Sequence, residues 1–152
     1  MIFREAYVTD IPQLNEIRLS VKENALSNPL LVTYDDYVNY LTTNGKGWLC
    51  EADGKVLGFS IIDTTNQNIW ALFVRPGFEG NGIARKLQRL MLDWHFKKNI
   101  TTLWLSTAPG TRAEKFYEKS GWINTGFLKN GEIKFEMMIE RWLNSNENLM
   151  PE

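Results

Sequence analysis

A glycine-rich segment between an apolar stretch and a periodic stretch has residue types and spacing suited to chemistry. The apolar stretch ends at Leu72, Phe73 and Val74; a Pro-Gly pair follows; then come Glu79, Gly80, Asn81, Gly82, Ile83, Ala84 and Arg85. The pattern predicts a strand, a tight turn and the start of a helix. Backbone N–H groups point outward at a helix N-terminus, where the helix dipole favours negative charge. Because glycine has no Cβ, a phosphate can come close to the backbone. We interpret the segment as a phosphate or pyrophosphate site; an ordinary strand-to-helix turn is the alternative.

The familiar phosphate-binding motifs do not fit this segment. A dinucleotide fingerprint requires Gly-x-Gly-x-x-Gly after a first strand, and here the third small residue, Ala84, comes one position early. A P-loop ends in Gly-Lys-Ser/Thr, which this segment lacks. The anion site is therefore expected to be of another kind.

Length and composition narrow the class of protein. A chain of 152 residues suits one domain, and contents of 43% hydrophobic and 23% charged residues are ordinary for a globular protein. The net charge of −1 argues against nucleic acid as a partner, and no apolar run is long enough to span a membrane. The single cysteine, Cys50, excludes an internal disulfide framework and the usual cysteine-based zinc sites, and no metal is expected. The N-terminus does not read as a signal peptide, so we expect a cytoplasmic protein.

Hydrophobic periodicity and turn residues predict seven strands and four helices. The strands are expected over residues 2–8, 48–52, 56–63, 69–74, 103–106, 122–127 and 133–139. Helices are expected after Asp10, after Thr33, after the glycine-rich segment and over 111–119. Hairpins within this order favour a mixed sheet with helices on both faces. The segment 144–152 is expected to be a polar, frayed tail after a single domain over 1–143.

The element order and two motifs resemble those of the GNAT superfamily of N-acetyltransferases. Gly82 and Ala84 match the last two small positions of its Gln/Arg-x-x-Gly-x-Gly/Ala signature, while Glu79 stands where the family has Gln or Arg. A second segment, Ala113 to Trp122, is similar to the family's Ala-x-x-x-Tyr-x-x-x-Gly-Phe, although Gly110 replaces a common Asn. Further pieces at 23–27, 70–74 and 109–114 are similar to a bacterial subgroup.

The resemblance implies the GNAT acyl-CoA N-acyltransferase fold, an α/β (α+β) arrangement. Its sheet is mixed, mostly antiparallel and of about seven strands, with helices on both faces. The implied reaction moves the acetyl group of acetyl-CoA to a primary amine of a small molecule or peptide, by direct attack in a ternary complex. Dimers are common in the superfamily, often through the last strands, so the resemblance also favours a homodimer.

The resemblance also implies roles for individual residues. Cofactor contacts fall on the main chain of Leu72, Phe73, Val74 and residues 79–84, with Arg85 and Arg112 as cationic candidates. Tyr117 stands where the family keeps its general acid, and a core aromatic is the alternative interpretation. The acceptor amine is expected to contact Asn24, Ser27, Tyr34, Trp70 and Glu136.

Two questions stay open at the level of sequence. Many relatives use a carboxylate on the fourth strand as general base, and this strand has none, so Glu23, Asp63, Glu136 and a water chain all remain candidates. The only histidine, His95, is interpreted as structural or exposed.

The function itself also has alternatives. A non-catalytic acyl-CoA-binding sensor or scaffold is the second possible function, and a structural partner protein without CoA binding is the third.

Overall fold

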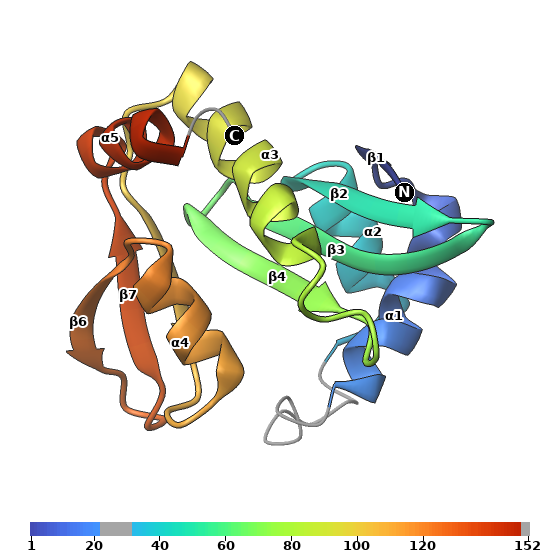
Figure 1. Ribbon diagram of the computed structural model, residues 1–152. Helices are drawn as coiled ribbons and strands as arrows, with labels where there is room; N and C mark the ends of the chain where they lie inside the picture. The colour runs from blue at the N-terminus through green and yellow to red at the C-terminus, as the bar shows by residue number, and fades with distance from the viewer. Residues whose placement is uncertain (22–31, 150–152) are drawn as a thin grey trace. The chain divides into compact units, whose positions relative to one another are not determined.

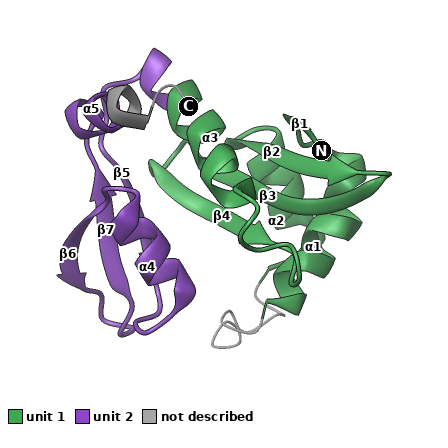
Figure 2. Cartoon of the chain, viewed as in Figure 1, with its two compact units in different colours: residues 1–94 green, residues 95–152 purple. Residues whose placement is uncertain are grey.

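The computed structural model describes residues 1–21 and 32–149 of the chain. Two compact units divide the chain, residues 1–94 and residues 95–152 (Figure 2). The described residues contain seven strands and five α-helices. Every expected strand and helix is present with slightly different ends, and one further helix closes the chain.

The first unit is built on four antiparallel strands. They run in the order β1 (Ile2–Glu5), β2 (Gly45–Ala52), β3 (Lys55–Asp63) and β4 (Asn68–Val74). A short 3-10 turn, η1 (Val8–Asp10), leads into α1 (Ile11–Ser20), which packs with α2 (Tyr34–Leu41) on one face of these strands. The helix α3 (Ile83–Lys98) covers the opposite face (Figure 1).

Local sequence signals explain how these elements begin and turn. Thr33 caps α2: its hydroxyl accepts from the Asp36 amide, and the Asp36 carboxylate accepts from the Thr33 amide. Asp53 and Gly54 connect β2 to β3, both with positive φ (53° and 78°), as a two-residue hairpin requires. Asp10 is the N-cap residue of α1, but its carboxylate makes no capping hydrogen bond to that helix and accepts from Arg4 and from the Tyr7 amide instead.

Both faces of β3 are buried, which makes this strand the centre of the core. Leu14, Ile17, Leu49, Phe59 and Ile61 are completely buried between the sheet and the pair α1–α2. On the other face, a Cβ added at Gly58 would lie 2.9 Å from the Ile83 side chain and 3.4 Å from that of Leu87. The absence of a side chain at Gly58 therefore lets α3 approach β3 closely.

A bulge in β4 separates its two halves. Ile61 pairs with Ala71, and Ile62 pairs with Ile69, so Trp70 is the extra residue of β4. The insertion directs the Trp70 ring to the face that α2 covers, where Tyr37 and Tyr40 contact it. A regular strand would have sent two neighbouring side chains to opposite faces.

The second unit has three antiparallel strands and two helices. The strand β7 (Ile133–Met137) lies between β5 (Leu103–Thr107) and β6 (Ile123–Phe127). The helix α4 (Arg112–Lys119) connects β5 to β6 and starts at Thr111, whose hydroxyl accepts from the Glu114 amide. Gly121, with φ of 93°, follows the end of α4.

The C-terminal helix α5 (Ile139–Leu149) corrects the expectation of a frayed tail. Residues 144–149 are helical, and Trp142 near the middle of α5 is 2% exposed. The polar run after Asn144 predicts no helix by itself, so the buried Trp142 and the turns before it account for this one.

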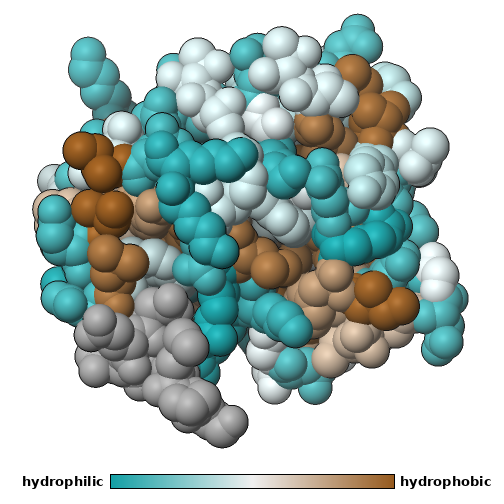
Figure 3. Space-filling view, turned by 90° about the horizontal axis from the view of Figure 1, so that it is seen from above, coloured by the Kyte–Doolittle hydropathy of each residue, from teal (hydrophilic) through white to brown (hydrophobic). Residues whose placement is uncertain are grey.

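Hydrophilic side chains cover much of the face seen in Figure 3, with smaller hydrophobic patches between them. No described helix combines the length and the apolar content needed to cross a lipid bilayer.

Candidate functional site

The elbow, which we define as residues 76–82 between β4 and α3, is open and held by glycines. Gly77, Gly80 and Gly82 have φ values of 97°, 82° and 77°, which only glycine adopts readily. A Cβ added at any of the three would meet no atom within 4 Å. The space over the elbow is therefore open to a ligand.

The amide groups at the start of α3 have no hydrogen-bond acceptor within the described part of the chain. Among the described residues, none of the amides from Gly80 to Arg85 donates a hydrogen bond to another residue, while the Lys86 amide donates to the Gly82 carbonyl over 3.1 Å. The Asn81 side chain donates to the Phe78 carbonyl over 3.0 Å, which stabilises the turn. Consecutive free donors at a helix N-terminus fit a phosphate or diphosphate group.

The charged side chains around the elbow differ in whether they already interact with other residues of the protein. The Glu79 carboxylate accepts from the Gly77 amide over 2.7 Å, so this acidic residue stabilises the turn. The Lys86 ammonium lies 4.6 Å from the centre of the Phe3 ring. Arg85 is exposed, and its side chain makes no hydrogen bond or ion pair with another described residue, which makes its guanidinium available to an anion bound at the elbow.

The hydrogen-bond pattern of β4 shows which main-chain groups face away from β3. The Arg75 amide donates to the Leu57 carbonyl over 2.7 Å, directly after the pair Gly58–Val74. In an antiparallel ladder, hydrogen-bonded pairs alternate with pairs that are not bonded. Leu72 and Val74 therefore direct their N–H and C=O groups away from β3, toward the opposite edge of β4, and Phe73 directs its own toward β3.

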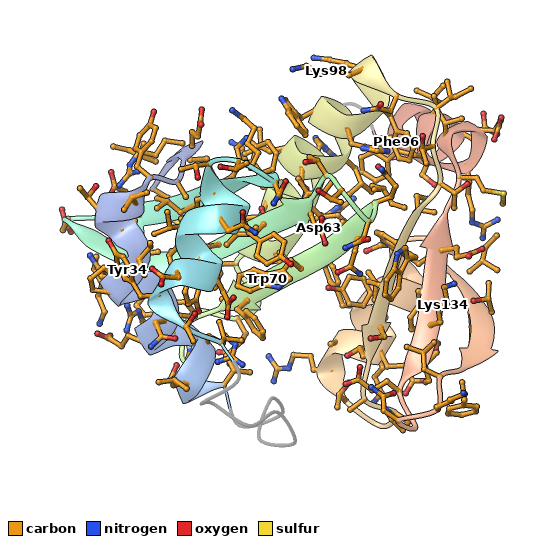
Figure 4. All side chains as sticks on the ribbon, turned by 180° about the vertical axis from the view of Figure 1, so that it is seen from behind. Tyr34, Asp63, Trp70, Phe96, Lys98 and Lys134 are labelled. Atoms are coloured by element: carbon orange, nitrogen blue, oxygen red, sulfur yellow. The ribbon has the colours of Figure 1, made fainter. Side chains whose placement is uncertain are left out.

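An aromatic cluster fills the face of β4 that α2 covers. The Trp70 ring stacks on Tyr40 with centroids 4.6 Å apart and meets Tyr37 edge-on at 5.3 Å. Tyr37 is buried, and its hydroxyl donates to the Asn15 amide oxygen over 3.3 Å. Tyr34, which Figure 4 labels at the start of α2, is 56% exposed. The structure thus brings Trp70 together with two tyrosines of α2 and leaves Tyr34 at the surface.

Tyr117 lies on the buried face of α4. Its ring contacts Phe116, Trp122 and Phe135, with centroids 5.3 to 6.0 Å away. Burial raises the pKa of its phenol well above the ordinary value. Within the described part of the chain, its hydroxyl makes no hydrogen bond. The phenol is therefore protonated at neutral pH and has a proton to donate.

Other expected site residues of the second unit lie at or near the surface. Arg112 is the first residue of α4 and is exposed. Gly110 precedes that helix with φ of 78°, and its amide donates to the Glu114 carboxylate over 2.7 Å. Glu136 on β7 is half-exposed and lies 3.6 Å from the Lys134 ammonium, and both project from the same strand.

Of the candidate general bases, the structure describes the surroundings of Asp63 but not those of Glu23. The buried Asp63 carboxylate accepts from the Thr65 and Asn66 amides and from the Asn66 side chain, so it stabilises the turn after β3. Glu23 lies outside the described residues, as do the expected acceptor contacts Asn24 and Ser27.

His95 is buried and structural, in line with one of its two interpretations. Its side chain is 1% exposed, and its Nε2 atom lies 2.8 Å from the Thr101 carbonyl. Burial lowers the pKa of the imidazole. Among the described residues, no group of three or more His, Cys, Asp or Glu side chains is arranged to hold a metal ion.

Sequence reasoning missed one residue at the elbow. Arg75 is the last residue before it, and its guanidinium contacts Val56 on β3 and Glu16 on α1. Glu16 lies 59 positions away in sequence, so no local pattern could have predicted the pair. The arginine next to Pro76 was the only available signal.

Comparison with known proteins places these elements in a family. Residues 11–122 match the acetyltransferase (GNAT) family. An uncharacterized N-acetyltransferase from Archaeoglobus fulgidus is 30% identical over 95 residues, which cover 54% of this chain and 64% of that protein. The chain therefore matches somewhat less than two thirds of the length of this curated relative.

Solved structures show the same fold. The paia N-acetyltransferase of Thermoplasma acidophilum, solved with coenzyme A, has a TM-score of 0.77 at 15% identity and covers 90% of this chain and 98% of its own. The smu.2055 protein of Streptococcus mutans UA159 has a TM-score of 0.76 at 16% identity, with 91% and 99% covered. A GNAT-family acetyltransferase from Staphylococcus aureus Mu50 has a TM-score of 0.74 at 20% identity, with 91% and 98% covered.

The family match spans most of the chain, and the solved structures confirm the expected α/β fold with seven mostly antiparallel strands. The resemblance carried by the glycine-rich segment and the Tyr117 segment is confirmed with it. This chain belongs to the acetyltransferase (GNAT) family.

Proposed function

We propose that this chain is an N-acetyltransferase that moves the acetyl group of acetyl-CoA to a primary amine of a small molecule or peptide. The attack is direct, in a complex that holds both substrates. Family membership supports acetyl transfer, and one observation carries the proposal further. The amides from Gly80 to Arg85 form a run of donors that have no acceptor among residues 1–21 and 32–149, under open space at a helix N-terminus.

The elbow fits the diphosphate of coenzyme A. Within residues 79–84, the main-chain N–H groups of residues 80–84 provide the donors, and no binding role is assigned to the Glu79 side chain. The Glu79 carboxylate is engaged by the Gly77 amide, which reduces its repulsion of a phosphate. We assign Arg85 as a cationic contact because it is exposed at the first turn of α3, and Arg112 as a second candidate.

The main chain of β4 fits an extended arm of the co-substrate. Acetyl-CoA supplies an activated acetyl group as a thioester. Leu72 and Val74 direct their N–H and C=O groups to the edge of β4 opposite β3, where they can pair with amide groups as a strand would. A main-chain N–H on this strand can stabilise the negative charge that develops on the thioester oxygen. Phe73 supports the strand through its contact with Phe59.

We assign the proton transfer to the departing sulfur to Tyr117. Its phenol stays protonated through the neutral range because burial raises its pKa. Its hydroxyl has no hydrogen bond among the described residues, so donation to sulfur breaks no existing contact. Phe116, Trp122 and Phe135 hold the ring in one orientation.

The acceptor amine is proposed to bind beside the aromatic cluster of β4 and α2. Trp70 presents a partly exposed ring there, and aromatic faces attract cations. The other proposed acceptor contacts are Tyr34, Glu136, Asn24 and Ser27. We propose in addition a single domain over residues 1–143, a cytoplasmic location and a homodimer.

A non-catalytic acyl-CoA-binding protein is the second candidate. Three features favour it: β4 carries no carboxylate, Gly110 replaces a common Asn, and Glu79 occupies the usual Gln or Arg position. Thiol release from acetyl-CoA across a panel of amines separates the two. Turnover with any amine supports the enzyme, and calorimetric CoA binding without turnover supports the binding protein. Absence of a heat of binding for CoA would overturn both.

A further inference from the structure

We infer that Arg75 is a positioning residue, which holds the elbow in the conformation that binds the diphosphate. The inference rests on the proposed function and adds a residue that touches no substrate. Although Arg75 is a cation next to an anion site, its contacts point elsewhere. Its role is therefore expected to be mechanical, acting through the main chain of the elbow.

The Arg75 side chain turns toward α1 and β3. Its Nε atom donates to the Val56 carbonyl over 2.8 Å, and its Nη1 atom donates to the Glu16 carboxylate. The side chain is only 11% exposed. This pairing lowers the pKa of Glu16, so the charge pair persists through the neutral range. Two of the five guanidinium N–H donors are thus engaged, and the largely buried side chain is directed toward α1 and β3, away from the exposed elbow.

The main chain of Arg75 anchors the elbow at its first turn. The Arg75 amide donates to the Leu57 carbonyl over 2.7 Å, and the Arg75 carbonyl accepts from the Phe78 amide over 3.0 Å. Beyond this point the elbow is exposed at Gly77 and at 79–82. The position of the elbow therefore depends on how firmly Arg75 is fixed.

A second polar contact ties the same joint to α1. The Val56 amide donates to the Gln13 side-chain oxygen over 2.8 Å, and the Gln13 side-chain nitrogen donates to the Gly54 carbonyl over 3.2 Å. The Val56 N–H thus donates a hydrogen bond to Gln13 of α1, and the Val56 C=O accepts one from Arg75. Val56 is only 1% exposed, so loss of the Arg75 side chain leaves a buried carbonyl without that donor.

Removal of the Arg75 side chain should weaken binding only of the diphosphate, which is the part of the co-substrate proposed to contact the elbow. We expect Arg75→Ala to lower kcat/KM for acetyl-CoA about tenfold, because amides displaced by a fraction of an ångström bind the diphosphate poorly. The rate with S-acetylpantetheine, which carries the same thioester and no diphosphate, should stay unchanged. A general loss of folded protein would lower both rates equally.

The experiment compares these two acyl donors across four proteins: wild type, Arg75→Ala, Arg75→Lys and Glu16→Gln. Lysine keeps the charge next to Glu16 but not the two-sided contact, so partial rescue is expected. Lys129→Ala is the matched control, because Lys129 is exposed, its side chain makes no hydrogen bond or ion pair with another described residue, and its replacement also removes one positive charge. Circular dichroism and urea midpoints measure the folded fraction of each variant.

The outcomes separate the inference from the function on which it rests. A wild-type protein that fails to prefer acetyl-CoA over S-acetylpantetheine contradicts the diphosphate site itself. The positioning role is overturned if the wild type prefers acetyl-CoA but Arg75→Ala and Glu16→Gln lower the rates with acetyl-CoA and S-acetylpantetheine by the same factor. Selective loss with acetyl-CoA in both variants supports it. If Arg75→Ala does not fold, Glu16→Gln decides, because it alters only the exposed end of the pair.

Discussion

Trp70 of β4 stacks on Tyr40 of α2, with ring centroids 4.6 Å apart and ring planes inclined by 29°. The bulge at Trp70 makes this contact possible, because it brings the side chain to the same face as Ala71. A residue inserted in a strand, packed on a helix and still partly exposed is well placed to recognise a substrate.

We predict that Trp70→Ala raises KM for the acceptor amine about fivefold and leaves KM for acetyl-CoA within a factor of two, as the loss of one aromatic contact of about 1 kcal/mol implies. Steady-state kinetics with each substrate varied in turn measures this. Trp70→Phe is the control, because it retains a ring against Tyr40. An increase of both KM values together would indicate that Trp70 only supports the strand.

Gly82 and Gly54 form a matched pair for testing the elbow. Their φ values are 77° and 78°, and an added Cβ meets no atom within 4 Å at either position. Alanine at each should therefore lower the free energy of unfolding by about 1 kcal/mol, since both demand the left-handed conformation. We predict that only Gly82→Ala weakens CoA binding, by tenfold or more, because its methyl group occupies the space proposed for the diphosphate. Calorimetric titration with CoA measures the difference, and equal affinities for the two variants would contradict the elbow site.

We predict that Tyr117→Phe lowers kcat about a hundredfold, the typical contribution of a general acid, with little loss of stability. Stability should be retained because the hydroxyl makes no hydrogen bond within the described residues and the ring contacts with Trp122 and Phe135 remain. Tyr7→Phe, at an exposed tyrosine, is the control.

The pH profile supplies a second check on Tyr117. Burial raises the pKa of its phenol above the ordinary value of about 10, so the acid form persists as the pH rises. The wild-type rate should therefore show no loss from phenol ionisation up to pH of about 10. A rate that falls with a midpoint near pH 8 would assign the proton transfer to another group.

Much of this fold follows from residues that act locally. The Thr33 capping box, the Asp53–Gly54 hairpin and the start of α3 after Gly82 are each specified by side chains within a few positions, and the structure has all three. The site is less predictable because its groups act over long sequence distances. The contact between Arg75 and Glu16 joins elements 59 residues apart, and the bulge at Trp70 depends on the register with β3.

The helix α5 is an element that local helix propensity does not predict. Residues 144–149 are Asn-Ser-Asn-Glu-Asn-Leu, in which most positions have poor helix propensity. Propensity therefore argues against a helix there, and the buried Trp142, one turn after Met138, indicates that packing overrides it. Such an effect is visible only once the surroundings of Trp142 are known.

The two basic residues after the elbow should differ in their effect on CoA binding. The exposed Arg85 side chain makes no hydrogen bond or ion pair with another described residue, whereas the Lys86 ammonium lies over the Phe3 ring. We predict that Arg85→Ala weakens CoA binding about fivefold at low salt and less at high salt, as expected for an exposed ion pair. Lys86→Ala should change the affinity by less than half as much. Titrations at two ionic strengths measure both, and a larger effect at Lys86 would reverse the assignment.

His95 should make the stability of the protein depend on pH between neutrality and about pH 5. Burial lowers the pKa of His95 in the folded state below 6.5, so the unfolded chain binds its proton first as the pH falls. The free energy of unfolding then decreases on acidification, with a slope of at most about 1.4 kcal/mol per pH unit. Asp10 and Glu16 also have lowered pKa values, but they act below their ordinary values of 3.8 and 4.5. Urea midpoints at pH 7.5 and 5.5 should differ in the wild type and differ less in His95→Gln; an equal shift in both proteins would exclude His95 as the cause.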